Sequence, residues 1–149
     1  MKLLKIYLAA AWSRRDEIAE VANELRKLPN LEITSRWLKE PTVLGSKIVR
    51  GNRFRRRRAQ EDVDDVLRAD MLVRFSDDLS GATVPAKLAT GSRMFEQGLA
   101  YAKGKRIVIV GGPQPIFDYL PEMTHLRHLD ELKNYLIGLQ KTSKRKGHK

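Results

Sequence analysis

The sequence predicts an α/β fold in which a mostly parallel sheet of four to five strands lies between two layers of helices. Short, nearly continuous apolar runs at residues 3–9, 71–75 and 107–110 are typical of strands that are covered on both faces. Apolar residues at helical spacing follow these runs, and alternating strands and helices favour a parallel sheet. A chain of 149 residues has the length of one domain with a substantial core.

The first predicted unit is a strand, a turn and a helix. After the strand at 3–9, residues 13–16 have the pattern of a capping box, and apolar residues at helical spacing continue over 18–25. Pro29 and Asn30 end this helix, and the alternating segment 31–37 predicts a second strand.

The remaining elements follow the same alternation. They are a long basic loop at 40–58, a helix at 59–70, the strand at 71–75, an irregular stretch at 76–90, a helix from Gly91 to Gly104, the strand at 107–110, a short edge strand at 124–127 and an amphipathic helix at 129–139. We therefore expect one domain over residues 1–140, followed by a basic, disordered tail at 141–149.

The formal net charge of +11 comes from two segments. Residues 50–58 contain six arginines and no acidic residue, and residues 141–149 contain five lysines and arginines. Since these charges equal the net charge, the rest of the chain is neutral. Two basic segments on a neutral body predict weak, non-specific binding of nucleic acid through Arg50 to Arg58 and the tail, and disfavour a sequence-specific reader.

Composition also excludes several chemistries. The chain has no cysteine, which excludes disulfides, thiolate metal sites and cysteine nucleophiles and favours a reducing cytoplasm. The three histidines do not have the spacing of a zinc site, so we predict neither metal nor cofactor. The apolar run at 6–12 has the minimum length for a signal peptide, and no run approaches the ~20 residues of a membrane helix.

Ligands of open parallel sheets bind beyond the carboxyl ends of the strands, which narrows the search for a site. Glu96 lies near the start of a predicted helix, where the helix dipole is expected to lower its proton affinity. A fixed, ionised carboxylate can attack an electrophilic sugar carbon, although acids are also common in first turns without any catalytic role.

Three segments resemble the nucleoside 2-deoxyribosyltransferase family, over roughly residues 5–112. They are residues 5–12 (KIYLAAAW), Asp62 with residues 69–73 (ADMLV), and residues 91–102 (GSRMFEQGLAYA) with Gly104 and Lys105 before a strand. The third segment is the most specific. The resemblance implies a flavodoxin-like three-layer fold and a homo-oligomer, either a dimer or a higher form.

The resemblance also implies a role for each matching residue. Glu96 would be the nucleophile that attacks the anomeric carbon, Tyr7 would position it, and Asp62 would contact the base and assist its protonation. The reaction would be a double displacement through a glycosyl-enzyme ester, as in retaining glycosidases. From the residues alone, Tyr7 could equally be a core aromatic and Asp62 a solvated residue at a helix start.

The chain departs from the family pattern at one place that bears on the substrate. Thr90 stands six residues before Glu96, where family transferases commonly carry an aspartate that holds the sugar 5′-hydroxyl. A hydroxyl residue there favours a phosphorylated substrate, because an aspartate would repel phosphate. Arg14, Arg15 and Arg93 could then supply positive charge, whereas Asp77 or Asp78 could replace the missing carboxylate.

The sequence therefore predicts an enzyme that cleaves the N-glycosidic bond of a deoxynucleoside or its 5′-monophosphate and transfers the sugar to another base or to water. Two alternatives stay open, a nicotinamide dinucleotide hydrolase and a non-catalytic module that binds nucleotides or nucleic acid. The expected substrate-binding residues, besides the three catalytic ones, are Trp12, Arg14, Asp77, Thr90, Gly91 and Ser92.

Overall fold

The computed structural model describes residues 2–39, 51–76 and 91–146. Five strands form one sheet in the order β2-β1-β3-β4-β5, and every pair of neighbours is parallel. The strands are β1 (Leu4–Ala9), β2 (Leu31–Ile33), β3 (Met71–Phe75), β4 (Arg106–Val110) and β5 (Thr124–Leu126). This order is the one that flavodoxin-like doubly wound folds share, so the predicted fold class is confirmed.

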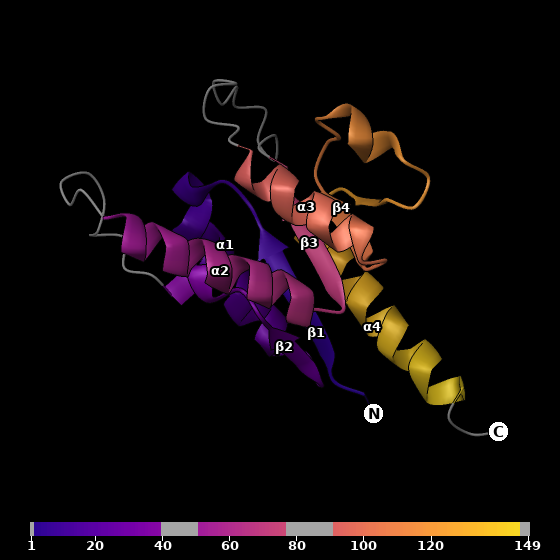
Figure 1. Ribbon diagram of the computed structural model, residues 1–149. Coiled ribbons are helices and arrows are strands. Elements are labelled where there is room, and N and C mark those ends of the chain that lie inside the picture. The colour runs from indigo at the N-terminus through magenta and orange to yellow at the C-terminus, as the bar shows by residue number, and fades with distance from the viewer. Residues whose placement is uncertain (1, 40–50, 77–90, 147–149) are drawn as a thin grey trace.

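The four α-helices in the described part of the chain cover the two faces of this sheet. Helices α2 (Asn52–Arg68) and α3 (Ser92–Ala102) lie side by side on one face (Figure 1). Helices α1 (Arg15–Arg26) and α4 (Leu129–Lys146) cover the other face, where an ion pair of 3.4 Å joins Lys133 of α4 to Glu24 of α1. Among the described residues, no helix is long and apolar enough to cross a membrane.

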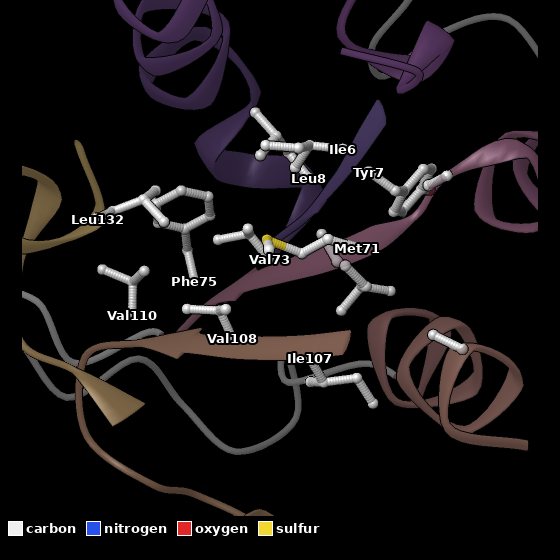
Figure 2. Close-up of a cluster of buried hydrophobic side chains, with 14 of the residues drawn as sticks. Ile6, Tyr7, Leu8, Met71, Val73, Phe75, Ile107, Val108, Val110 and Leu132 are labelled. Carbon is white, nitrogen blue, oxygen red and sulfur yellow. The ribbon is translucent and has the colours of Figure 1, made fainter. Parts of the chain in front are cut away.

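The strands send alternate side chains to the two faces. Ile6 and Leu8 of β1 lie in register with Met71 and Val73 of β3, and these side chains pack toward α1 and α4. Tyr7 of β1 points the other way, toward α2 and α3 (Figure 2). All five side chains are buried, so β1 and β3 contribute to two separate packing layers.

Several element boundaries differ from the sequence-based expectation. Residues 52–58, expected within a basic loop, form the first half of α2, because arginine is a good helix former and the helix needs no apolar residue over these exposed turns. The strand expected at 31–37 ends at Ile33, and Arg36–Lys39 form a short 3-10 helix. The expected disordered tail at 141–149 was wrong in part, since α4 continues to Lys146.

The expected capping box at residues 13–16 is also wrong. Trp12–Arg14 form a 3-10 turn that leads directly into α1, so that Arg14 occupies the N-cap position and no side chain caps the helix. Asp16 and Glu17 in the first turn still favour the helix through its dipole.

Candidate active site

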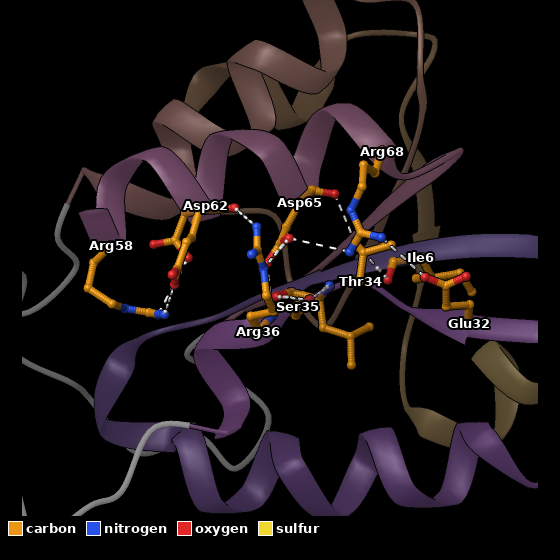
Figure 3. A network of polar contacts seen from close by, with 11 residues as sticks. Ile6, Glu32, Thr34, Ser35, Arg36, Arg58, Asp62, Asp65 and Arg68 are labelled. Carbon is orange, nitrogen blue, oxygen red and sulfur yellow. Dashed lines mark hydrogen bonds and ion pairs between the residues drawn. The ribbon is translucent and has the colours of Figure 1, made fainter. Parts of the chain in front are cut away.

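Helix α2 is fastened to the strands below it by a buried polar network. The fully buried Asp65 of α2 accepts hydrogen bonds from the backbone N–H of Arg36 at 2.9 Å and from its Nε at 2.8 Å. The hydroxyl of Thr34, just after β2, donates to the Asp65 carbonyl at 2.9 Å. Figure 3 shows this network and, one turn earlier on α2, the side chain of Asp62. The network therefore fixes the rotation of α2 and with it the direction of Asp62.

A pocket of about 430 Å³ lies between α2 and α3. Two carboxylates line it, Asp62 from α2 and Glu96 from α3. The remaining lining residues are small or apolar, with Gly91 and Ser92 at the start of α3, and they are Ala59, Val63, Gly91, Ser92, Phe95 and Leu99. A mostly apolar pocket with two acids can hold a planar base and a sugar and act on the bond between them.

Glu96 is the fifth residue of α3 and lies half-buried in this pocket. Burial raises the pKa of its carboxyl to about 8, with a further contribution from the negative charge of Asp62. The expectation that the helix dipole lowers the proton affinity of Glu96 was wrong. The helix dipole acts mainly on the first turn, and Glu96 lies beyond that turn. The loss of hydration on burial therefore has a larger effect on its pKa than the dipole has.

The pKa of the Asp62 carboxyl is also raised, by a smaller amount than that of Glu96. Burial raises the pKa of its carboxyl to about 6, opposed by Arg58, whose Nη2 lies 3.6 Å from Asp62 Oδ1. Asp62 Oδ1 is buried and accepts no hydrogen bond. Two carboxyls with pKa values of about 6 and 8 that repel each other titrate as a pair, so at neutral pH they share one proton.

Tyr7 lies beneath the pocket on β1. Its hydroxyl is buried and has no partner at good hydrogen-bond geometry, yet it is close enough to Glu96 that hydrogen bonding with it lowers the pKa of Glu96. Burial, first, and the charges of Glu96 and Asp62 raise the pKa of the Tyr7 hydroxyl, so Tyr7 stays protonated. It can donate to the Glu96 carboxylate and orient it.

The structure thus brings five of the predicted site residues together: Tyr7, Asp62, Gly91, Ser92 and Glu96. Two others, Asp77 and Thr90, lie outside the described residues. Whether the substrate carries a hydroxyl or a phosphate at its 5′-position was argued from these residues, so the expected preference for a phosphate stays a prediction.

Trp12 and Arg14 do not line the pocket between α2 and α3. Trp12 is 55% exposed and lies over the guanidinium of Arg15 at 5.6 Å. Arg14 donates to the carboxylate of Glu17 at 2.7 and 2.8 Å and to the carbonyl of Ser76 at 2.6 Å. These contacts connect α1 with the end of β3 and give Arg14 a structural role.

Sequence reasoning missed a buried ion pair on the same face of the sheet. Arg74 of β3 and Asp118, in the 3-10 turn Ile116–Tyr119, are both fully buried and paired. Asp118 also accepts from Gln97 Nε2 of α3 at 3.2 Å and from the backbone N–H of Gln114 at 2.8 Å. The signal was the single charged residue inside the apolar run 71–75, which requires a buried partner.

Comparison with known proteins gives similarity at the level of structure. No family model matches the sequence, and no curated protein matches it either. A 2-deoxyribosyltransferase from Bacillus psychrosaccharolyticus superposes with a TM-score of 0.61 and 16% identity, covering 88% of this chain and 91% of that one.

Two further solved structures agree with this similarity. A CMP N-glycosidase from Clostridium botulinum has a TM-score of 0.51 and 14% identity, covering 89% of this chain and 97% of that one. A conserved protein from Enterococcus faecalis has a TM-score of 0.56 and 18% identity over 89% and 96% of the two chains. The expected likeness to the nucleoside 2-deoxyribosyltransferase family is therefore confirmed in the fold.

Proposed function

We propose that this protein cleaves the N-glycosidic bond of a 2′-deoxynucleoside or its 5′-monophosphate, with Glu96 as nucleophile and Asp62 as general acid. The observation that carries the proposal is that these two carboxyls, on different helices, line one pocket and have raised pKa values of about 8 and 6. The structural likeness to a 2-deoxyribosyltransferase and to a CMP N-glycosidase supports the reaction class.

The pair supplies both functions that the reaction needs. Near neutral pH one proton is shared between Asp62 and Glu96, so that one group is an acid while the other is a carboxylate. Positive charge develops at C1′ of the sugar, beside Glu96, and stabilises the ionised form of Glu96. The proton of the pair is then held by Asp62. Glu96 then attacks C1′, the bond between C1′ and the base nitrogen breaks, and its electron pair takes the proton from Asp62.

The second half of the reaction restores the enzyme. Water, or the nitrogen of a second base, attacks C1′ of the glycosyl ester and releases Glu96 as a carboxylate. Asp62, now ionised, takes the proton that the attacking group loses. Transfer and hydrolysis therefore differ only in the nucleophile of this second step, and we propose both as outcomes of one site.

The test is Glu96→Gln, which keeps the size of the side chain and removes the nucleophile. We expect base release from a panel of deoxynucleosides and 5′-monophosphates, measured by chromatography, to fall by at least about a thousandfold. The matched control is Glu61→Gln, on α2 next to Asp62 but outside the pocket lining, which should retain activity within a few-fold. A Glu96→Gln variant with more than about a tenth of wild-type activity would contradict the proposal.

A further inference from the structure

The first half of α2 carries a group of exposed arginines that the proposed reaction does not use. Arg53, Arg55, Arg56 and Arg57 are all exposed to solvent. No acidic residue lies in the first turn of α2, where acids would stabilise the helix and arginines destabilise it. The helix dipole therefore gives no reason for a group of arginines at this end of α2.

Two of these arginines lie on the side of α2 that lines the pocket. With 3.6 residues per turn, Arg55 and Arg56 lie one turn before Ala59 and on its side of the helix, which continues to the pocket residues Asp62 and Val63. Within the described residues, neither arginine takes part in an ion pair or a side-chain hydrogen bond. Arg55 and Arg56 thus present two free guanidinium groups beside the pocket.

Arg53 and Arg57 lie on the opposite side of the helix. Arg57 contacts the ring of Phe54 at 5.3 Å and lies 3.9 Å from the carboxylate of Glu61. The helix therefore offers an internal comparison between two arginines that face the pocket and two that face away from it.

The pocket also has an exposed aromatic side chain at its edge. Phe95 lines it and is 65% exposed, which is unusual for a phenylalanine on a helix packed against a sheet. Basic side chains beside an exposed aromatic ring are the combination that binds single-stranded nucleic acids, because the bases stack while arginines hold the phosphates.

We infer that the protein acts on a nucleotide within a single-stranded nucleic acid, with Arg55 and Arg56 binding the phosphates next to the nucleotide in the pocket. The inference rests on the proposed function, since the pocket is taken to hold one nucleoside unit. Arg55 lies seven residues before Asp62, about 10 Å along the helix axis, or about three stacked nucleotides.

The experiment measures binding, so that it does not depend on turnover. The full chain carrying Glu96→Gln is titrated against a fluorescent eight-nucleotide DNA strand of mixed sequence, and the measurement is repeated with Arg55→Gln and Arg56→Gln added together. We expect these two substitutions to weaken binding about tenfold near 0.1 M salt and to lower the salt slope by about 1.4, the value for two phosphate contacts on a single strand. The control pair, Arg53→Gln with Arg57→Gln, removes the same charge and should change binding less than about threefold.

Competition with unlabelled ligands separates the sources of phosphate. An equimolar mixture of 5′-mononucleotides and a duplex of the same sequence should both compete at least about tenfold less well than the single strand. Equal losses in the two double variants, a mononucleotide mixture that competes as well as the strand, or a duplex that does so would each overturn the inference. None of these results concerns Glu96→Gln activity, so failure here leaves the proposed reaction standing, and failure of that reaction is seen separately in base release.

Discussion

The two faces of the sheet are built from the same strands but differ in what they bury. On the side of α1 and α4, the buried layer is apolar and includes Ile6, Leu8, Val73, Leu132 and Leu136. Its contribution to stability comes from burial of apolar surface, with about 1.5 to 3 kcal/mol for each large side chain. None of these five side chains is titratable.

On the side of α2 and α3, the same strands bury polar and charged groups. Tyr7 of β1 and Arg74 of β3 lie on this face, each one residue away from an apolar neighbour that points to the other face. Above them lie Asp62 and Glu96, whose pKa values are raised mainly by burial. The comparison shows how alternation along a strand lets one face stabilise the fold while the other holds buried titratable groups.

The largest stability effect is expected from breaking the buried ion pair on the site face. Asp118→Ala leaves Arg74 fully buried without its carboxylate and should lower the free energy of unfolding by about 3 to 5 kcal/mol. Urea denaturation measures this loss. Adding Arg74→Met to Asp118→Leu should recover much of the stability, because it removes both charges, and a single Asp118→Ala loss below about 1 kcal/mol would contradict the prediction.

A substitution on the apolar face should lower the free energy of unfolding by less and leave the rate of base release unchanged. Leu136→Ala on α4 removes a fully buried side chain and should lower the free energy of unfolding by about 2 to 4 kcal/mol through lost burial and a residual cavity. Well below its melting temperature, the variant should keep the wild-type rate of base release. A matched change on the exposed side of the same helix, Lys141→Ala, should alter neither quantity.

The sequence was sufficient to predict the layers of the fold and to single out the two carboxyls that line the pocket between α2 and α3. The apolar strands and the spacing of apolar helix residues identify the parallel sheet, because both patterns arise from burial itself. Glu96, Asp62 and Tyr7 were named from a motif resemblance, which preserves residue types and spacing. Their proximity in one pocket agrees with that prediction, while their roles stay a proposal.

Other features depend on tertiary contacts that no local pattern specifies. The raised pKa of Glu96 depends on how deeply α3 packs, which the position of Glu96 in the helix does not reveal. The start of α2 at Asn52 was missed because the expected loop was identified by charge, and an exposed helix can be entirely polar there. Asp118 could not be paired with Arg74 in advance, since 44 residues separate them and their partnership is set by the return of the chain after β4.

Substitution of Tyr7 should have the smallest effect on stability and the most specific effect on the pH dependence of the reaction. Tyr7 lies on β1 between Ile6 and Leu8, which point to the opposite face of the sheet. Tyr7→Phe removes a buried hydroxyl that has no partner at good geometry, so the free energy of unfolding should change by less than about 1 kcal/mol. The hydroxyl lowers the pKa of Glu96, so its loss should move the alkaline limb of the pH dependence of kcat/KM, where the carboxyl pair loses its one proton, to higher pH than in the wild type. The proton is then held more tightly on Glu96, so the form with Glu96 ionised and Asp62 protonated becomes rarer, and base release at pH 7 should drop by about tenfold. Tyr101→Phe, an exposed tyrosine on the same helix as Glu96 but outside the pocket lining, is the control and should leave the profile unchanged. A Tyr7→Phe profile that superposes on the wild type would show that Tyr7 serves packing alone.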